Sequence, residues 1–387
     1  CYFYPSNKIT ADADIQLSTF DKSMVLLNGA KHITFEGLNF SYTRENIFYG
    51  NQVSDISVKD CVISHTSGWG GTFSGYRIKF DRCHIYDTGY GGIRLQGGDR
   101  KNLIPSDSSV TNCIFSENDM VQRAYSPAVK INSGIGFTIM NNHIYNNAHN
   151  AILMEQSGIN DVTISNNDIH DVVTEYGDAA AIYWYRNVSS LGITINNNYL
   201  HQIGNPYCMG WSQSIFGDDF CMGAEIYNNI FYQGTLTEEN GGTTKKSYPI
   251  KTNQGQFFNV HNNIFVDSPS AAYFQPTDNY GKNSLVKWIL FNTKTNRKTT
   301  SDGSFAYDHG QEWKYIKDFV DDENWMKHYG YNKEDGTTST IWGNMFKYFS
   351  TEKYEKLKAY ADAKNEEALF NEADSYAPSK TNKFTDN

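Results

Sequence analysis

The sequence has few prolines, no excess of positive charge and no long apolar run. Of its 387 residues only 8 are proline, and 33 basic side chains stand against 43 acidic ones, which gives a formal charge of −10. So few prolines, with 31 glycines, argue against a disordered or fibrous chain. Nucleic-acid binders normally carry a basic patch, so no nucleic-acid partner is expected. No stretch approaches the roughly 20 apolar residues of a membrane helix, so no membrane association is expected either.

The chain begins at Cys1, with neither an initiator methionine nor a leader of charged and then apolar residues. A mature protein, or a piece of a larger one, begins in this way. We therefore expect this chain to be part of a longer polypeptide.

Nine short segments of alternating apolar residues recur along the first two thirds of the chain, at intervals of 22 to 34 residues. They are ITFEGLNF (33–40), ISVKDCVI (56–63), IKFDRCHI (78–85), SSVTNCIF (108–115), FTIMNNHI (137–144), VTISNNDI (162–169), ITINNNYL (193–200), AEIYNNIF (224–231) and FNVHNNIF (258–265). Alternation predicts that each is a strand with one buried face. A fixed core with variable spacing is typical of stacked coils that carry insertions on one side.

In these segments, the position two residues before the end is occupied by a small set of residue types. They are Leu38, Cys61, Cys83, Cys113, Asn142, Asn167, Asn198, Asn229 and Asn263. If successive segments stack about 4.8 Å apart, the asparagine amides hydrogen-bond along the stack. The three cysteines are expected to be buried free thiols, because stacked side chains seldom have disulfide geometry. Cys1, Cys208 and Cys221 lack the spacing of metal ligands.

A second series places a small residue before an aliphatic one. Its members are GIRL (92–95), AVKI (128–131), AILM (151–154), AIYW (181–184), SIFG (214–217) and PIKT (249–252). Each falls between two members of the first series, so every coil has at least two strands. We therefore predict an all-β fold, a right-handed parallel β-helix of about nine coils, with handedness taken from the rule for parallel crossovers.

The repeats suggest three parts. Residues 1–30 are expected to be lead-in strands, residues 31–280 the β-helix with its groove, and residues 281–387 a mixed, partly helical C-terminal cap or appendage. Within the last part, 351–370 has the pattern of an amphipathic helix with one apolar face, formed by Tyr354, Leu357, Tyr360 and Ala361.

Three columns of the second series are expected to face outward. The small one, taken as a shallow floor, is Gly92, Ala128, Ala151, Ala181, Ser214 and Pro249. The others are Arg94, Lys130, Leu153, Tyr183, Phe216 and Lys251, and Gln96, Asn132, Glu155, Tyr185, Asp218 and Asn253. A trough of this composition suits a sugar chain, whose CH faces stack on rings while its hydroxyls take polar partners. The alternative is an ordinary polar exterior without a ligand.

Acidic residues gather beside this trough. Asp178 precedes AIYW, Asp218 and Asp219 follow SIF, and Glu155 lies one coil earlier. Outward side chains lie about 5 Å apart on adjacent coils and about 10 Å apart on next-but-one coils. These distances bracket the carboxyl separations of both retaining and inverting glycosidases, so both mechanisms remain open. A carboxyl crowded by other acids and by rings such as Tyr183 resists ionisation, as a general acid must. The alternatives are surface aspartates, with Asp219 anchoring a turn.

Further side chains on this face are candidates for substrate contact. The full expected set is Glu155, Tyr183, Tyr185, Arg186, Phe216, His149, Lys130 and Arg123. Each has a structural alternative: a salt bridge for Arg186, a hydrogen bond to the neighbouring coil for His149, and loop anchoring for Arg123 with Tyr125.

Several longer motifs follow one another in an order that resembles a known family. They are FSYTRENIFYG (40–50), TGYGGIRLQGGDR (88–100), RAYSP (123–127), AHNAI (148–152), GDAAAIYWYR (177–186) and IFGDDFCMGAEIYNNIFY (215–232). The order is similar to that in the β-helix glycosidases of glycoside hydrolase family 141, which includes α-L-fucosidases and xylanases acting on plant cell-wall polysaccharides. The resemblance covers most of residues 1–270.

The resemblance implies catalysis by two aspartates, at positions matching Asp178 and Asp218 or Asp219. It also implies a secreted protein, extracellular or periplasmic, with a polysaccharide or oligosaccharide as its partner. No cofactor or metal is expected, and structural calcium is not indicated. The chain departs from the family pattern at Ala180, where related sequences carry glycine, and in YRNV (185–188), where they carry a GRDW-like run.

Two other functions remain open. A polysaccharide lyase on the same scaffold would use Lys130, Arg94 and Lys251 to neutralise a uronate and abstract its proton. A non-catalytic glycan-binding β-helix would keep the groove without the chemistry, and the altered YRNV segment keeps this alternative open.

Overall fold

The structure is a computed structural model of the chain. It describes residue 10 and residues 17–155, 157–204, 212–232, 248–268, 270–275, 316–363, 365–373 and 382–387. Predictions about Cys1, Cys208, the side chain of Ala361, and most of residues 1–16 and 276–315 therefore lie outside the described residues.

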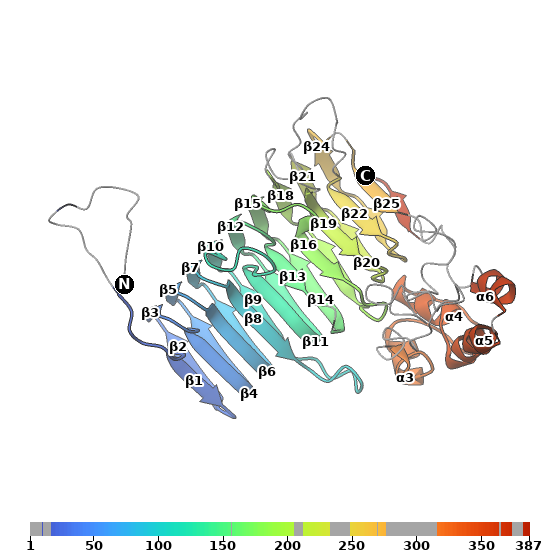
Figure 1. Cartoon of the computed structure of the whole chain (residues 1–387), viewed down its shortest axis with the longest axis horizontal. Helices are drawn as coiled ribbons and strands as arrows, with labels where there is room; N and C mark the ends of the chain where they lie inside the picture. The colour runs from blue at the N-terminus through green and yellow to red at the C-terminus, as the bar shows by residue number, and fades with distance from the viewer. Residues whose placement is uncertain are drawn as a thin grey trace, which may run out of the picture.

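The strands stack in parallel rungs along the length of the molecule and form two sheets (Figure 1). The nine-stranded sheet consists of β3 (Asn39–Thr43), β5 (Val62–Thr66), β7 (His84–Thr88), β10 (Ile114–Asn118), β12 (His143–Asn147), β15 (Asp168–Val172), β18 (Tyr199–His201), β21 (Ile230–Tyr232) and β24 (Ile264–Val266). Each strand pairs with its counterparts in the neighbouring coils. This pairing across coils is what the repeating segments predict.

The second sheet has seventeen strands and contains two ladders. Its strands are β1 (Val25–Asn28), β2 (Lys31–Glu36), β4 (Phe48–Lys59), β6 (Trp69–Asp81), β8 (Gly91–Gly97), β9 (Ser108–Thr111), β11 (Val129–Met140), β13 (Ile152–Met154), β14 (Ile159–Ser165), β16 (Ala179–Tyr185), β17 (Ile193–Asn196), β19 (Ser212–Asp218), β20 (Ala224–Tyr227), β22 (Ile250–Asn253), β23 (Asn259–His261), β25 (Ala272–Gln275) and β26 (Lys383–Thr385). The long strands β4, β6 and β11 run through both ladders. Each coil therefore has three faces, and the described strands form a parallel β-helix.

The segments expected to be single strands are each broken in two by a tight turn, which corrects that prediction. In 137–144, for example, β11 ends at Met140 and β12 begins at His143. Asn141 at the break is left-handed, with φ 58°. Asparagine tolerates this conformation better than most residues, so the first asparagine of each NN pair makes the turn.

The second asparagine of each pair forms the predicted internal ladder. Asn142 donates from both its backbone N and its Nδ2 to Asn167 Oδ1, each at 3.0 Å, and Asn167 donates in the same way to Asn198 Oδ1. The pattern continues through Asn229 and Asn263. Asn263 then donates to Asn387, so the last residues of the chain add a rung that the repeats did not reveal.

The cysteines behave as predicted where they are described. Cys61, Cys83 and Cys113 are buried free thiols in one column of the core, and Cys221 is also buried and free. The backbone N of Cys83 donates to Cys113 Sγ at 3.4 Å, so the column continues the hydrogen-bonded register of the asparagines.

The second series forms the ladder that carries the candidate site. This site ladder comprises β8, the first half of β11, β13, β16, β19, β22 and β25. Its inward residues are aligned as predicted, in the order Ile93, Val129, Ile152, Ile182, Ile215 and Ile250.

The small-residue column, however, does not floor an outer trough. Ala128, Ala151 and Ala181 are fully buried members of the main core. A Cβ on Gly92 would lie 2.8 Å from the ring of Phe115, which belongs to β10 of the opposite sheet. These residues sit at an inner corner between the two sheets, where only a small side chain fits.

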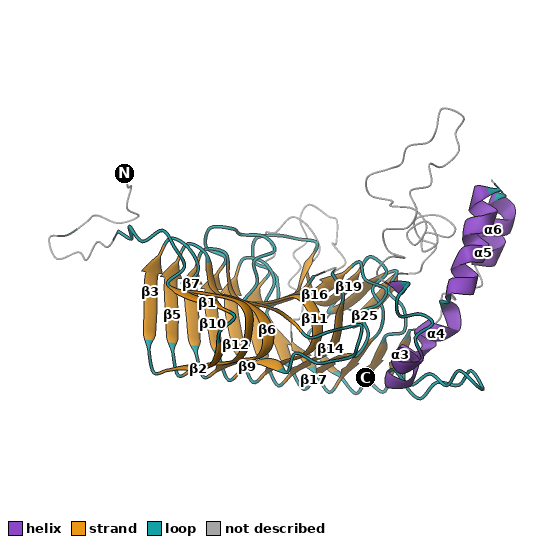
Figure 2. Ribbon diagram, turned by 90° about the horizontal axis from the view of Figure 1, so that it is seen from below, coloured by secondary structure: helices purple, strands orange, loops and turns teal. Residues whose placement is uncertain are grey.

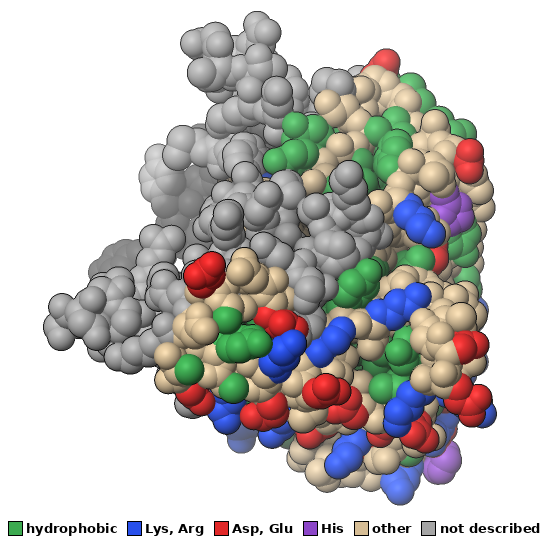
Figure 3. All heavy atoms as spheres, turned by 90° about the vertical axis from the view of Figure 1, so that its right-hand side faces the viewer, with side chains coloured by type: hydrophobic (Ala, Val, Ile, Leu, Met, Phe, Trp, Pro, Cys, Tyr) green, Lys and Arg blue, Asp and Glu red, His purple; other side chains and the backbone are tan. Residues whose placement is uncertain are grey.

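Helices occupy one end of the molecule, beside the last coils (Figure 2). They are α3 (Glu323–His328), η1 (Trp342–Asn344), α4 (Met345–Tyr348), α5 (Thr351–Asp362) and α6 (Glu366–Ala373). Tyr354 and Leu357 of α5 are buried, as the amphipathic pattern predicts, and Tyr360 packs against the same cluster. That cluster includes Val188 and other turn residues of the β-helix. Helices α3, η1 and α4 thus pack against turns of the coils, through Trp325, Trp342 and Tyr348. Basic and acidic side chains are interspersed over the described surface of this end (Figure 3).

Candidate active site

Asp218 lies at the end of β19, in register with Tyr185 on one side and in the same outward column as Asn253 on the other. Its side chain is almost covered, with 8% of the residue exposed. Tyr183 Oη donates to Asp218 Oδ2 at 2.8 Å, and Asn253 Nδ2 donates to Oδ1 at 2.8 Å. Because these partners come from the coil before and the coil after, the carboxyl position depends on the stacking of three coils.

The pKa of Asp218 is raised to about 6. Burial is the main cause, followed by the charge of Asp219, while the hydrogen bonds from Asn253 and Tyr183 oppose the shift and the charge of Asp178 adds to it. Near neutral pH this carboxyl can therefore exchange a proton, as acid–base catalysis requires.

Asp219 occupies the turn that follows β19. Its backbone is left-handed, with φ 47°, as is that of Arg186 one coil earlier, with φ 55°. Arg186 Nε donates to Asp219 Oδ2 at 2.7 Å, and Asn253 Nδ2 lies 3.2 Å from Asp219 Oδ1. The arrangement matches the alternative in which Asp219 anchors the turn and Arg186 forms a salt bridge.

Asp178 is exposed and precedes β16, with φ 56°. Its charge contributes to the raised pKa values of Asp218 and Tyr183. Asp178 directly precedes β16, which pairs with β19, the strand that ends at Asp218. An exposed carboxyl and a buried carboxyl thus belong to two neighbouring coils of the site ladder.

Aromatic side chains, not small ones, line the outer face of the ladder. Leu153, Tyr183 and Phe216 form a separate buried cluster with Ala180, and Tyr185 packs beside it. The ring of Tyr183 is 5.3 Å from that of Tyr185 and 5.5 Å from that of Phe216, measured between centroids. A layer of packed and largely buried rings therefore underlies the site, with Tyr185 partly exposed at its edge.

Cationic and acidic groups alternate along this layer of rings. Lys130 Nζ lies 2.5 Å from Glu155 Oε1, and Tyr185 Oη donates to Glu155 Oε2 at 2.5 Å. Lys251 is buried, with its Nζ 4.5 Å from the centre of the Phe216 ring. Burial lowers the pKa of Lys251, and the charges of Asp178 and Asp218 oppose that effect.

Of the remaining predicted contact residues, His149 lies close to these groups and Arg123 is held by protein partners. His149 is buried at the entrance to β13 and is influenced by the charge of Asp178. Arg123 pairs with Glu175, with Nε 2.9 Å from Oε2, and its Nη1 donates to the backbone oxygen of Asp119 at 3.2 Å. These contacts match the loop-anchoring alternative for Arg123.

Two residues near the site were not recognised as candidates from sequence. Asp119 is fully buried, and burial raises its pKa to about 7, against hydrogen bonds from the backbone N atoms of Ala148 and His149. Asn253 joins Asp218 to Asp219. The outward column contained Asn253, but nothing in the repeat distinguished Asp119, which lies in an insertion.

The GGDR motif has a structural role. Arg100 donates to Asn160 Oδ1 at 2.7 Å and to Ser189 Oγ at 2.6 Å, and its guanidinium lies 5.0 Å from the centre of the Phe319 ring. Trp325 Nε1 donates to the backbone oxygen of Arg100 at 3.0 Å. Arg100 therefore joins the coils to the C-terminal helices.

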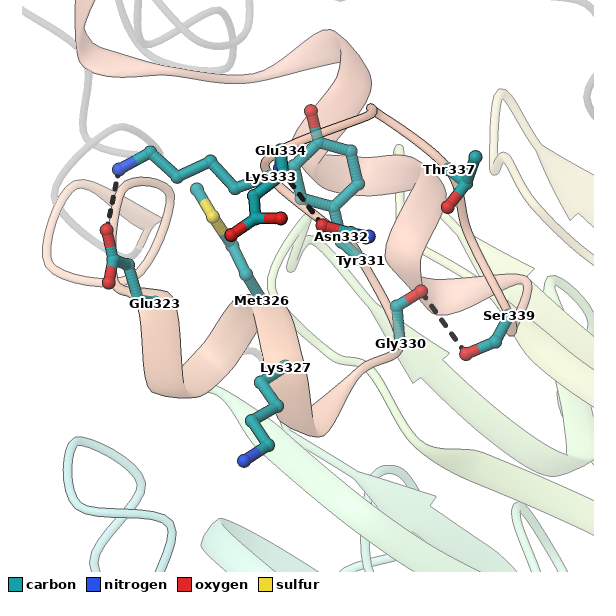
Figure 4. Close-up of a pocket in the computed structure, with 10 residues that line it drawn as sticks. All are labelled: Glu323, Met326, Lys327, Gly330, Tyr331, Asn332, Lys333, Glu334, Thr337 and Ser339. Carbon is teal, nitrogen blue, oxygen red and sulfur yellow. Dashed lines mark hydrogen bonds and ion pairs between the residues drawn. The ribbon is translucent and has the colours of Figure 1, made fainter.

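A cavity of about 750 Å³ lies elsewhere, between α3 and the loop that follows it (Figure 4). Two charged residues on its rim, Glu323 and Lys333, pair with each other at 2.8 Å. Across the described ranges, no group of three or more His, Cys, Asp or Glu side chains is arranged to hold a metal, and no helix is long and apolar enough to cross a membrane. The carboxyl pair on the site ladder remains the stronger candidate site.

Comparisons with known proteins agree with the architecture. A family model described as a right-handed β-helix region matches residues 9–200. No curated protein sequence matches the chain. A crystal structure of the selenomethionine derivative of a GH136 lacto-N-biosidase from Eubacterium ramulus is similar over 59% of this chain and 51% of that chain, with 10% identity and a TM-score of 0.28. This chain thus spans about half the length of that protein, and a likeness of this size says nothing about the site.

The stacked parallel strands and the family match lead to one conclusion. The chain is a right-handed parallel β-helix with a partly helical C-terminal segment.

Proposed function

We propose that the protein is a glycoside hydrolase in which Asp218 protonates the leaving oxygen and Asp178 is the second carboxylate. The observation that carries the proposal is the contrast between these two acids on neighbouring coils of the site ladder. Burial and the charge of Asp219 raise the pKa of Asp218 to about 6, whereas Asp178 is open to solvent. Glycosidases need two carboxyl groups in different environments, because one must be protonated and the other ionised when the reaction begins.

The surroundings of the acids support a sugar as the substrate. The ring of Tyr185 is partly exposed, with the buried rings of Tyr183 and Phe216 packed beside it, and amide and carboxylate groups flank these rings. Sugar CH faces pack on aromatic rings, and sugar hydroxyls hydrogen-bond to amides and carboxylates. In this proposal Asp219 positions Arg186 and raises the pKa of Asp218, and takes no direct part in proton transfer.

The proposed substrate class is plant cell-wall polysaccharide, either xylan or fucosylated pectin and its oligosaccharides. This finer assignment depends on the resemblance of motifs such as GDAAAIYWYR (177–186) to glycoside hydrolase family 141. Because such polysaccharides lie outside cells, the proposal includes action in an extracellular or periplasmic compartment.

The test is a product screen on xylan, pectin and fucosylated oligosaccharides. Asp178→Asn and Asp218→Asn should each lower kcat by about 10²–10⁴-fold, the usual contribution of a positioned acid or base. Asp267→Asn, a change at an exposed aspartate in the turn after β24, serves as the control and should leave kcat unchanged. Full activity of Asp218→Asn at neutral pH would contradict the assignment of the acid.

The burial of Lys251 favours one alternative, a polysaccharide lyase. A lysine whose pKa is lowered by burial can act as the base that removes a proton beside a uronate carboxyl group. Release of an unsaturated uronate product from pectin by the wild type, abolished in Lys251→Met, would replace hydrolysis by this reaction.

A further inference from the structure

We propose that Tyr125 and Tyr176 form a sugar-stacking subsite beside Asp178, backed by the buried ring of His149. The inference rests on the proposed function, since it names where a glycan substrate makes a contact outside the layer of rings. It also assigns Arg123 as a brace of this subsite instead of a direct ligand of the substrate.

The three rings lie in contact at the entrance to β13 and β16. The centroid of the His149 ring is 4.9 Å from that of Tyr125 and 5.7 Å from that of Tyr176. His149 is 3% exposed, whereas Tyr125 is 45% and Tyr176 is 41% exposed. Two rings are thus presented to solvent from one buried support.

This support is fixed in orientation. Asn150 Oδ1 is 2.5 Å from His149 Nδ1, and Asn150 Nδ2 donates to the backbone oxygen of Ala180 at 2.7 Å. The bond to Ala180 sets which end of the amide faces the histidine, so Nδ1 carries the proton that Asn150 accepts. Burial lowers the pKa of His149, which keeps the ring neutral at ordinary pH.

The loop that carries Tyr125 is held at several points. The backbone N atoms of Ala148 and His149 donate to the buried carboxyl of Asp119, at 3.3 and 3.1 Å. Arg123 ties the loop to Glu175, close to Tyr176, and Lys130 Nζ lies 3.4 Å from the backbone oxygen of Tyr125.

Tyr125 itself has φ 57°, a left-handed conformation that is uncommon for an aromatic residue. The same conformation occurs at many turns of this chain, including those at Tyr42, Phe220 and Phe257. Here the bracing contacts hold an unfavourable backbone so that a ring faces solvent.

Two features connect the rings with the catalytic face. Lys130 Nζ lies 3.4 Å from the backbone oxygen of Tyr125 and 2.5 Å from Glu155 Oε1, and Glu155 Oε2 accepts from Tyr185 Oη. Tyr176 lies two residues before Asp178, in the segment that enters β16. Burial raises the pKa of Tyr125, and the charge of Asp178 adds to this effect.

The test measures hydrolysis of xylohexaose, 2′-fucosyllactose and hexagalacturonate by Tyr125→Ala and Tyr176→Ala. For the probe that the wild type cleaves, KM should rise about tenfold in each variant, the size expected for loss of one stacking contact, while kcat falls by no more than about twofold. Tyr125→Phe should keep the wild-type KM, because the ring is retained. Alanine at position 125 bears the same left-handed strain as tyrosine, so unfolding temperatures near that of the wild type should accompany these changes.

Tyr199→Ala is the matched control. Tyr199 is also exposed and stacks on a histidine, His201, at 4.2 Å, but it lies on the outer face of the nine-stranded sheet. An unchanged KM in Tyr125→Ala and Tyr176→Ala, or an equal rise in Tyr199→Ala, would overturn the subsite.

Failure of the proposed reaction is separable from failure of the subsite. If the wild type cleaves none of the three probes, calorimetric titration with the same oligosaccharides decides the matter. Binding that is lost in Tyr125→Ala and kept in Tyr199→Ala supports the subsite without hydrolysis, and absence of binding by the wild type refutes it.

Discussion

At the scale of single residues, the proposed chemistry depends on how Asp218 differs from its neighbours. Asp218 and Asp219 are adjacent in sequence, but the first ends a strand and the second occupies a left-handed turn. Asp219 is therefore available to Arg186, while Asp218 is covered and held by Tyr183 and Asn253. One step along the chain thus separates a salt-bridge partner from a carboxyl that exchanges protons near neutral pH.

This difference predicts a pH profile. As the proposed general acid, Asp218 must be protonated, so kcat/KM should fall as pH rises through the pKa of Asp218, near 6. The hydrogen bond from Tyr183 stabilises the carboxylate, and Tyr183→Phe should raise that pKa and move the alkaline limb of the kcat/KM profile to higher pH by about 0.5 to 1 unit.

Tyr185→Phe is the control, because its hydroxyl bonds to Glu155 and not to Asp218. Its alkaline limb should coincide with that of the wild type. A downward shift of the limb in Tyr183→Phe would show that another group controls the proton transfer.

At the scale of strands and turns, the stack is held by side chains as well as by the backbone. Each ladder asparagine accepts from the backbone N of the preceding ladder residue and donates to a backbone oxygen, as Asn167 does with Asn142 and Ile139. These groups are buried, so removing one hydrogen-bond partner leaves the other polar group unsatisfied and lowers the free energy of unfolding by the desolvation cost of that group.

Asn167→Ala should therefore lower the free energy of unfolding by about 3 kcal/mol, since it leaves the buried backbone N of Asn142 without its acceptor and removes one hydrogen bond each from Asn142 Nδ2, Asn198 Oδ1 and the backbone oxygen of Ile139. Denaturant unfolding measures the change. Thr163→Ala, at an exposed position of β14 in the same coil, should stay within about 0.5 kcal/mol of the wild type. Equal effects of the two variants would mean that the ladder contributes little.

At the scale of the whole molecule, segments distant in sequence complete the coils. Strand β26 pairs with β23, and Asn387 completes the ladder above Asn263. Helices α3, η1 and α4 pack on turns of the coils, and Arg100 lies at that interface between Asn160 and the ring of Phe319.

Arg100→Ala should weaken this interface. Loss of two hydrogen bonds from a charged donor and of the stacking on Phe319 should lower stability by about 3 kcal/mol and speed proteolytic cleavage within residues 316–373. Limited proteolysis with mass spectrometry measures it, beside Lys101→Ala at the exposed neighbouring position. Identical cleavage rates in the two variants would remove Arg100 from the interface.

The sequence by itself determined the coil and its registers. Inward residues such as Ile152 and Ile182, the asparagine ladder and the free thiols follow from periodicity, because stacked neighbours occupy equivalent positions in successive repeats. The outward column containing Tyr185, Asp218 and Asn253 was predictable for the same reason.

Only the tertiary structure decided the burial and the hydrogen-bond partners of the residues at those positions. The small residues face an inner corner because two sheets meet there, and the break within each segment depends on a backbone turn that alternation does not reveal. The burial that raises the pKa of Asp218, the bracing of Tyr125 by an insertion, and the added rung at Asn387 all arise from contacts between segments far apart in the chain. A repeat encodes which residues stack, but the solvation of a carboxyl depends on everything that packs around it.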